Sequence, residues 1–358
     1  MTQKVYVAMS GGVDSAGAAL LLQHQGFDVA GVTLRLHRCT DPLGQCGGSD
    51  EEDAAAENAR ALGIPHTVLD LCDLFGTKVM DRFVSEYRAG RTPNPCVDCN
   101  REIKFGALLD WVLAQGGDFL ATGHYARTQR DAATGRQLLL RGRDRKKDQS
   151  YMLYQLTQRQ LAHVLLPIGE YDKPAIRHLA AERGLASAGR PDSEDICFVP
   201  GGDYMEFLET YGGVRPAPGF FVDEAGHVLG RHRGLERYTT GQRKGLGVSA
   251  GVPVYVLRKD SAHNAVVLGP ESALFHRALS ACRMNWISGL APNARLRVSA
   301  KIRYSQQGAA AAAEPLPDGR CRVIFEMPQR AVTAGQAVVL YDGEQVVGGG
   351  TIEAVEDA

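Results

Sequence analysis

Residues 8–15 read Ala-Met-Ser-Gly-Gly-Val-Asp-Ser and lie between an apolar run at residues 5–7 and a helix-forming stretch at residues 16–25. This order predicts a strand, a glycine-rich turn and a helix. Glycines let backbone N–H groups approach an anion closely, and the positive end of the following helix favours negative charge. The segment is therefore suited to bind phosphate oxygens, although a plain tight turn is the simpler alternative.

The segment is not a Walker loop, because that motif needs a lysine after its last glycine to reach the terminal phosphates. Residues 8–15 contain neither lysine nor arginine. Ser-Gly-Gly-Val-Asp-Ser instead resembles the pyrophosphate loop (PP-loop) of N-type ATP pyrophosphatases, which split ATP into AMP and pyrophosphate while adenylating an oxygen of their substrate. The resemblance implies activation of a substrate rather than phosphoryl transfer.

Strand and helix signals alternate over the first two hundred residues, which predicts a parallel sheet with helices on both faces. Ligands of such sheets bind outside the C-terminal strand ends, where the loop at Ser10 and the turn at Gly123 are both expected. The resemblance implies an adenine nucleotide α-hydrolase-like (PP-loop) fold for this α/β domain. Strands are predicted at 29–36, 66–71 and 119–122, helices at 51–62, 73–89, 101–114 and 173–183, and a hairpin at 127–143.

The pattern changes after Pro200 to short β-branched segments separated by glycine and proline. The later segments have the spacing of a small antiparallel barrel, and the alanine run 309–313 is interpreted as a loose surface turn. We therefore expect a PP-loop catalytic domain at 1–200, a β-rich central domain at 201–278 and a C-terminal β-barrel at 279–358. The predicted strands lie at 219–222, 252–258, 265–268, 296–302, 322–325, 336–341 and 346–352.

Composition limits the class of protein. The chain has 358 residues and a formal net charge of -1, which excludes a uniformly basic nucleic-acid coat. Residues 127–147 hold eight Lys and Arg against two Asp, and residues 231–259 hold seven against one Glu; each run is either a solvated face or a local polyanion site. The sequence predicts no membrane span, no signal peptide and a cytoplasmic location. Its eight cysteines then favour reactive or metal-binding roles over disulfides.

Three cysteines stand where chemistry is plausible. Cys96 and Cys99 precede the predicted helix at 101–114, and a helix N-terminus lowers the pKa of a thiol, so we expect reactive thiolates there. Cys197, next to Phe198, would alone be a buried small apolar residue, but an adenylating loop in the same chain favours a chemical role. The remaining cysteines show no partner pattern and are interpreted as structural: Cys39, Cys46, Cys72, Cys282 and Cys321.

Six motifs, in order along nearly the whole chain, resemble those of the bacterial tRNA-specific 2-thiouridylase family. The resemblance implies that ATP adenylates the C2 oxygen of the wobble uridine (U34) of tRNA. A cysteine persulfide then replaces that oxygen by sulfur, giving 2-thiouridine, AMP and pyrophosphate. Partners implied are tRNA, through its anticodon stem-loop, and a sulfur-relay protein or cysteine desulfurase. The motifs occupy residues 8–15, 92–105, 121–125, 147–151, 192–198 and 241–247.

The resemblance also assigns roles to the thiols. Cys197 would carry the persulfide, and Cys99 would help release the sulfur, leaving a Cys99–Cys197 disulfide for a reductant to reopen. This agrees with general chemistry, because an adenylate leaves far more easily than a carbonyl oxygen and a second thiol can finish the transfer by exchange. Cys96 stands where some members carry aspartate. It either lines the target-base pocket with Asn94 and Pro95, or joins Cys99 and Cys197 in holding an iron–sulfur cluster.

The resemblance also implies which residues contact ATP and its metal ion. Asp14 is the expected indirect anchor for Mg²⁺, since a carboxylate beside a triphosphate needs a cation between them. Leu34, which is also plain strand core, and Gly123 would contact adenine and ribose. The remaining ATP-binding residues implied are Ala8, Met9, Ser10, Gly11, Gly12, Val13 and Ser15.

RNA contacts are expected along the basic runs and in the barrel. Arg303 and Tyr304 would offer a cation beside a stacking face for unstacked RNA, and an extruded uridine would enter the base pocket. His124 is a candidate RNA contact or simply a capped turn histidine. The tRNA-binding residues implied are His124, Lys147, Asp148, Gln149, Arg303, Tyr304 and Gln336.

Two other classes of protein share part of this pattern. An amidating ligase of the same superfamily would share the loop but would need neither paired thiols nor a basic β-rich half. A non-catalytic RNA-binding protein on a nucleotide-binding scaffold would release no pyrophosphate when given ATP and tRNA. The ligase would also require an ammonia source, of which the sequence shows no sign, and an assay of pyrophosphate release tests the non-catalytic alternative.

Overall fold

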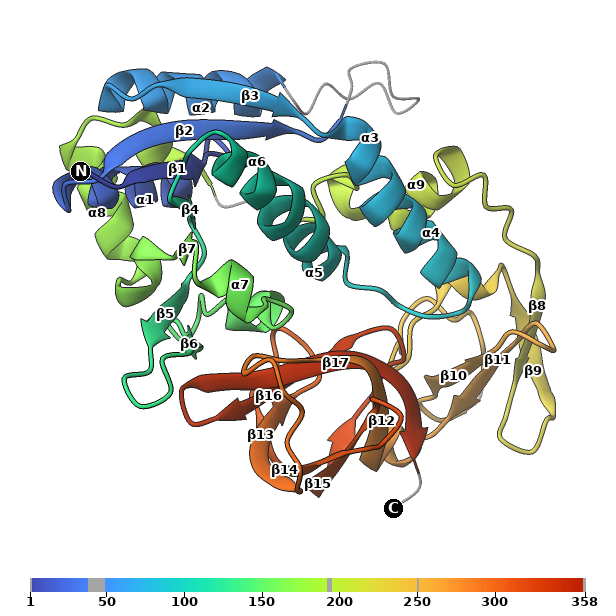
Figure 1. The fold of residues 1–358 in the computed structure, drawn as a ribbon. Helices are drawn as coiled ribbons and strands as arrows, with labels where there is room; N and C mark the ends of the chain where they lie inside the picture. The colour runs from blue at the N-terminus through green and yellow to red at the C-terminus, as the bar shows by residue number, and fades with distance from the viewer. Residues whose placement is uncertain (1, 38–48, 192–194, 250, 357–358) are drawn as a thin grey trace.

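The structure is a computed structural model that describes residues 2–37, 49–191, 195–249 and 251–356. An α/β layer at the N-terminal end, a central β-sheet and a C-terminal barrel follow one another along the chain (Figure 1). The interpretation of Cys39 and Cys46 as structural, and residues 192–194 of the fifth motif, lie outside the described residues.

The N-terminal sheet is parallel throughout, with strand order β3-β2-β1-β4-β7. Strand β1 lies in the middle, and the order of the strands reverses there, which is where open α/β sheets bind ligands. The side chains of Val5 and Val7 are fully buried. The predicted parallel sheet is confirmed. Its strands are β1 Lys4–Ala8, β2 Asp28–Arg35, β3 His66–Asp70, β4 Phe119–Thr122 and β7 Val164–Leu165.

Helices cover this sheet as predicted, with one difference that affects the site. The helix expected to begin at Arg101 begins at Pro95, because proline suits the first position of a helix. Cys96 and Cys99 therefore lie inside its first turns and do not precede it. The longer helical elements are α1 Val13–His24, α2 Ser49–Leu62, α3 Cys72–Phe75 with η1 Gly76–Met80 and α4 Asp81–Arg88, α5 Pro95–Asp98 with η2 Cys99–Leu108 and α6 Leu109–Ala114, α8 Lys173–Glu182 and α9 Tyr204–Thr210. The short ones are η3 Ser150–Leu153, α7 Gln158–Leu161, η4 Pro167–Glu170, η5 Ala186–Gly189, η6 Pro200–Gly202, η7 Leu235–Arg237 and η8 Glu271–Leu274.

The central part is a four-stranded sheet of order β10-β11-β8-β9. Its small core is built around Phe221, Tyr238 and Val256. The predicted β-rich character is confirmed. Its strands are β8 Gly219–Val222, β9 Val228–His232, β10 Tyr255–Asp260 and β11 Ala265–Gly269.

The C-terminal strands close into an antiparallel barrel, because β12 pairs with both β15 and β17. The predicted barrel is confirmed, but the interpretation of residues 309–313 as a surface turn is wrong. These alanines form most of β14, and Ala313 is fully buried between β13 and β15. Alanine favours strands little, but its small side chain fits a crowded barrel wall. The strands are β12 Phe275–Trp286, β13 Leu296–Lys301, β14 Ala309–Pro315, β15 Cys321–Arg330, β16 Ala337–Asp342 and β17 Gln345–Glu356.

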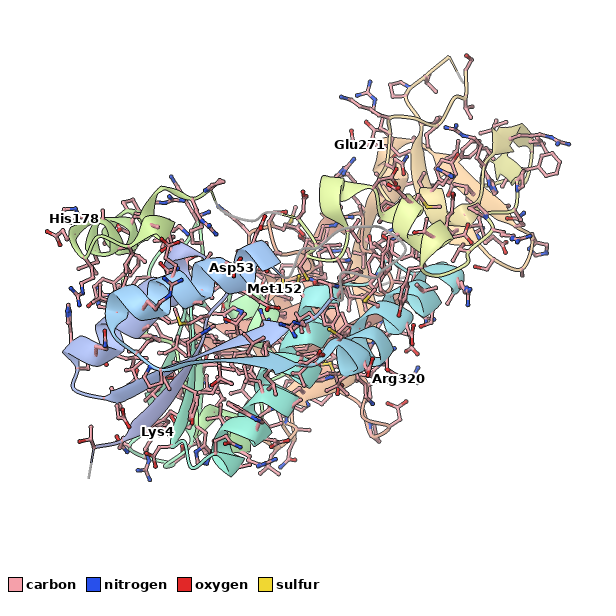
Figure 2. All side chains as sticks on the ribbon, turned by 90° about the horizontal axis from the view of Figure 1, so that it is seen from above. Lys4, Asp53, Met152, His178, Glu271 and Arg320 are labelled. Carbon is pink, nitrogen blue, oxygen red and sulfur yellow. The ribbon has the colours of Figure 1, made fainter. Side chains whose placement is uncertain are left out.

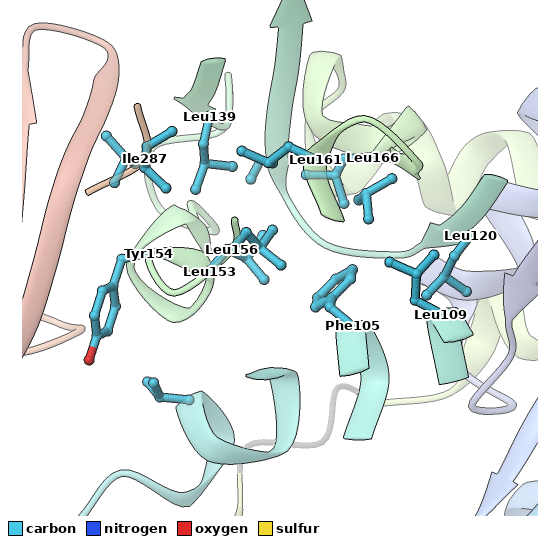
Figure 3. Close-up of a cluster of buried hydrophobic side chains, with 14 of the residues drawn as sticks. Phe105, Leu109, Leu120, Leu139, Leu153, Tyr154, Leu156, Leu161, Leu166 and Ile287 are labelled. Atoms are coloured by element: carbon cyan, nitrogen blue, oxygen red, sulfur yellow. The ribbon is translucent and has the colours of Figure 1, made fainter. Parts of the chain in front are cut away.

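The barrel and the α/β layer share one hydrophobic core. The predicted hairpin, β5 Ala126–Arg130 and β6 Gln137–Arg141, joins the barrel sheet where Leu140 pairs with Gln345 of β17. Figure 3 shows the shared cluster, which runs from Leu120 and Phe105 on the sheet side to Ile287 beside the barrel. Side chains fill the space between the layers, with Met152 near the middle of the molecule (Figure 2). Within the described ranges, no helix is long and apolar enough to cross a membrane.

Candidate active site

The glycine-rich loop connects β1 to α1 at the sheet's C-terminal edge. Gly11 has a φ of 75°, and a side chain there would meet the Glu51 carbonyl oxygen at 2.8 Å, so only glycine fits. Gly12 caps α1 without a side-chain hydrogen bond. Ser15 Oγ accepts from the Ser10 N–H at 3.2 Å and donates to the Gly12 carbonyl at 3.0 Å. These contacts fold the loop around the N-terminus of α1, as an anion site requires.

Other predicted nucleotide contacts surround this loop. A side chain at Gly123 would come within 2.7 Å of the Asp14 carbonyl carbon and the Ser15 nitrogen, so the β4 turn touches the start of α1. Leu34 lies near the end of β2 and packs against two of the core clusters. Met9 and Val13 are buried and offer only backbone atoms; the Met9 N–H already donates to Val32 in the sheet at 2.8 Å.

Both carboxylate oxygens of Asp14 have partners. Oδ2 lies 2.7 Å from Lys173 Nζ, and Oδ1 accepts from the Tyr125 hydroxyl at 2.8 Å. Gln149 fixes Tyr125 through two bonds to its backbone, with N–H···O distances of 2.9 and 2.8 Å. The carboxylate is therefore held in place beside the loop by groups from the turn after β4, from α8 and from the 147–151 motif.

The three candidate cysteines lie in one neighbourhood. Cys99 belongs to the hydrophobic cluster that also contains Phe198 and Val199, so the turn that carries Cys197 packs on the helix that carries Cys99. The thiol of Cys197 is close enough to Cys99 and Cys96 for both to affect its ionisation. Glu51, whose backbone touches Gly11, affects the same thiol. The described cysteines are all free thiols.

The expectation of lowered thiol pKa values is wrong. Burial raises the pKa of Cys99 to about 11 and outweighs the opposing effect of Lys104. The pKa of Cys197 is raised to about 12, first by desolvation and then by Cys99, although the residue itself is exposed. The pKa of Cys96 is also raised by desolvation. A short helix N-terminus does not compensate for an apolar surrounding, so the thiols are protonated at neutral pH.

Comparison with known proteins identifies the family. Residues 3–201 match the tRNA methyl transferase HUP domain, residues 205–270 the tRNA methyl transferase PRC-barrel domain, and residues 276–352 the aminomethyltransferase beta-barrel domain. A tRNA-specific 2-thiouridylase of Heliobacterium modesticaldum is 52% identical over 357 residues, which cover 98% of this chain and 93% of that protein. One of Moorella thermoacetica is 50% identical over 353 residues, which cover 98% and 99%. The chain belongs to the tRNA-specific 2-thiouridylase family.

The thiols of this thiouridylase do not fit an iron–sulfur cluster. Within the described ranges, no group of three His, Cys, Asp or Glu side chains is arranged to hold a metal ion. Magnesium fits better, because it binds through one or two carboxylates together with substrate phosphates, and Asp14 supplies such a carboxylate at the loop.

The target-base residues lie in a segment that the barrel holds. Gln336 Nε2 donates to the carbonyls of Thr92 at 2.9 Å and Pro93 at 3.4 Å, and the Thr92 N–H donates to Ala334 at 3.0 Å. Asn94 lines a small pocket between α4, α5 and the barrel, but Pro95 and Cys96 do not. The side-chain amide of Gln336, predicted to touch tRNA, thus fixes the segment before Asn94.

The other predicted RNA contacts divide into buried and accessible groups. Asp148 accepts from the N–H groups of Gly142 and Ser150, at 3.0 and 3.1 Å. His124 is buried and bonds Thr122 through Nδ1 at 2.7 Å; burial and then Lys104 hold its pKa well below the usual range. Both side chains have structural partners in the chain itself.

Tyr304 keeps the stacking face that the sequence suggested. The residue is 37% exposed, and Lys301 Nζ lies 5.8 Å from the centroid of its ring. Arg303 instead donates to the carbonyls of Thr240 and Ala331, at 3.3 and 3.0 Å, and so links the central sheet to the barrel. The cation beside the ring is Lys301, which sequence reasoning missed.

Sequence reasoning also missed Tyr125, Lys104 and Lys173. Tyr125 directly follows the Gly123-His124 turn, so its position in a motif was an available signal. Lys104 lies in the 92–105 motif and opposes the raised pKa of all three thiols. Lys173 had no sequence signal, because it meets Asp14 across 159 residues.

Proposed function

We propose that this protein is an ATP-dependent tRNA 2-thiouridylase, a sulfurtransferase that makes 2-thiouridine at U34, AMP and pyrophosphate. The observation that carries the proposal is the packing around Cys197: its neighbours Phe198 and Val199 share a hydrophobic cluster with Cys99, and Glu51, whose carbonyl borders Gly11 of the glycine loop, is among the charges that act on the Cys197 thiol. A nucleotide site and two thiols distant in sequence are thus brought together. Family membership supplies the tRNA substrate class.

The glycine loop binds ATP for the first half-reaction, the adenylation of the uridine. Backbone N–H groups and hydroxyls of Ser10, Gly11, Gly12 and Ser15 bind the β and γ phosphates, and Leu34 and Gly123 contact adenine and ribose. Asp14 would serve as an indirect anchor for Mg²⁺, and the ion would neutralise phosphate charge. The C2 oxygen of the uridine attacks the α phosphorus, pyrophosphate leaves, and the oxygen becomes part of a good leaving group.

Cys197 and Cys99 carry out the second half-reaction, the transfer of sulfur to the uridine. A sulfur-relay protein or cysteine desulfurase loads one sulfur onto Cys197 as a persulfide. The outer sulfur bonds to C2, and AMP leaves with the former C2 oxygen. Cys99 then loses its proton to solvent, and its sulfur attacks the Cys197 sulfur and breaks the S–S bond, which releases 2-thiouridine and forms the Cys99–Cys197 disulfide. Because burial raises the pKa of Cys99 to about 11, only a small fraction of this thiol is ionised at neutral pH. A cellular reductant returns two electrons and restores both thiols.

The central and C-terminal parts position tRNA. Lys147 and Tyr304 offer charge and a stacking surface, while Asn94, Pro95 and Cys96 border the extruded base. His124, Asp148, Gln149, Arg303 and Gln336 support the same surface from within the fold. We keep the domain limits at 1–200, 201–278 and 279–358, and a cytoplasmic location, as parts of the proposal.

Mass spectrometry of tRNA nucleosides tests the function directly. The full chain is incubated with unmodified tRNA, Mg·ATP, a persulfide donor and a reductant. We expect 2-thiouridine at U34 with one pyrophosphate released per modified base. Pyrophosphate release that does not need tRNA would favour the ligase alternative, and no release at all would favour a non-catalytic RNA-binding protein.

The raised thiol pKa predicts an unusual pH dependence of alkylation. The thiolate is the reactive form, and the pKa of Cys197 is about 12. The rate of Cys197 carbamidomethylation, followed by peptide mass spectrometry, should therefore rise about tenfold per pH unit from pH 7 to 10. In urea the same thiol should level off near pH 9. A plateau below pH 9 in the folded protein would contradict the assignment.

The contacts of Gln336 predict that its replacement slows thiolation without weakening tRNA binding. Gln336→Ala removes the bonds to Thr92 and Pro93 and should slow thiolation about tenfold, because the target-base segment loses two hydrogen bonds. The Kd for tRNA, measured by filter binding, should change less than twofold. A large loss of tRNA affinity with unchanged kcat would show that the amide contacts RNA instead.

A further inference from the structure

The glycine loop has no cation of its own, and a distant helix supplies one. Residues 8–15 contain no lysine or arginine, yet Lys173 Nζ lies 2.7 Å from Asp14 Oδ2. A triphosphate bound at the loop adds several negative charges beside that carboxylate. Since like charges at such distances repel by several kcal/mol in a partly buried site, the site needs positive charge in addition to a helix end.

The fold fixes Lys173 in this position. Lys173 is the first residue of α8, whose N-cap Asp172 accepts from the Ala175 N–H at 2.9 Å. The Lys173 N–H donates to Asp144 at 3.3 Å. Helices α1 and α8 approach so closely that a side chain at Gly17 would come within 2.6 Å of Ile176. The lysine backbone is thus held tightly, while the four methylenes of the side chain allow its ammonium to be directed to a different partner.

The different exposures of Lys173 and Asp14 indicate that their ion pair has a functional role in addition to a structural one. The Lys173 side chain is 10% exposed and the Asp14 side chain 32% exposed, so the carboxylate is the more accessible member of the pair beside the glycine loop. A buried ion pair is an inefficient way to join two helices, because apolar side chains of the same size stabilise as well or better. The charged Lys173–Asp14 pair is better explained by a functional role, in which one of the two side chains exchanges this contact for another.

We propose that Lys173 is a nucleotide-binding residue whose ammonium neutralises Asp14 in the empty site and pairs with the β or γ phosphate when Mg·ATP binds. The exchange rests on the proposed function, in which Asp14 turns to the metal ion. Tyr125, which donates to the other oxygen of Asp14 at 2.8 Å, keeps the carboxylate oriented during the exchange. No covalent bond changes.

Equilibrium binding of Mg·ATP and of AMP tests this assignment. Lys173→Met should lose about tenfold in affinity for ATP and less than twofold for AMP, which lacks the β and γ phosphates. Lys173→Arg should keep most of the ATP affinity. His178→Ala is the matched control, since His178 lies on the outer side of the same helix with a 73% exposed side chain (Figure 2), and both affinities should be unchanged.

Equal losses for ATP and AMP, or no loss for either, would overturn the proposal.

Should Lys173→Met fold poorly, Mg-free ATP gives a second measurement. Asp14→Asn should bind Mg-free ATP more tightly than the native chain, because the ammonium no longer faces a carboxylate, and Asp14→Asn/Lys173→Met should lose that gain. Equal affinities of these two variants would also overturn it. Because binding needs no tRNA, failure of thiolation would count against the proposed function alone.

Discussion

Replacing Cys197 by serine is expected to reduce tRNA thiolation by at least about a thousandfold while pyrophosphate release stays within about twofold of the native rate. A serine hydroxyl cannot carry a persulfide, so sulfur never reaches the adenylated base. The nucleotide loop is untouched, because Cys197 lies in a separate turn. The two readouts are 2-thiouridine by nucleoside mass spectrometry and pyrophosphate by a coupled assay.

The native fold should tolerate this substitution. Cys197 is exposed, and substitutions at exposed positions usually change the free energy of unfolding by no more than about 0.5 kcal/mol. Cys282→Ser, in barrel strand β12, is the matched thiol control and should thiolate normally. Thiolation by Cys197→Ser at the native rate would remove this residue from the mechanism. Cys99→Ser should load sulfur on Cys197 but fail to release 2-thiouridine.

The sequence was sufficient for the parts of the site that depend on local order. The strand, glycine turn and helix around Gly11 were predicted, and they form at the centre of the sheet as expected. Most predicted strand and helix ranges in the α/β layer agree to within a few residues, because buried strands and amphipathic helices carry strong periodic signals; the exception is the helix predicted from Arg101, which begins at Pro95. Alternation also predicted the barrel, although β12 was missed.

The errors come from contacts between distant segments. The alanine run 309–313 has no strand pattern, and its pairing with β13 and β15 is imposed by barrel closure. The thiol pKa values were predicted from a helix end, but the apolar cluster around Cys99 includes Phe198, about a hundred residues away. The contact of Lys173 with Asp14 was not predicted for the same reason, because the two residues are 159 positions apart in the sequence. Ionisation and ion pairing depend on tertiary surroundings, which a local pattern does not contain.

Replacing Asp14 by asparagine is expected to reduce pyrophosphate release at least about a hundredfold while tRNA binding is retained. Asparagine keeps the size of the side chain and can still accept from Tyr125, but it lacks the charge that would hold Mg²⁺ and balance Lys173. The alanine variant should lose the same activity and also lose the contacts of Asp14 with Tyr125 and Lys173. Coupled pyrophosphate assays and filter binding of tRNA measure the two properties separately.

Stability provides the control for this experiment. Removing one partner of a buried ion pair costs about 3–5 kcal/mol, but Asp14 is 32% exposed, so we expect a loss of about 1–3 kcal/mol for Asp14→Asn. Asp110→Asn breaks the exposed pair with Arg159 and should change neither stability nor activity. Pyrophosphate release by Asp14→Asn at more than a tenth of the native rate would show that another group anchors the metal ion, since the loop would then activate the substrate without this carboxylate.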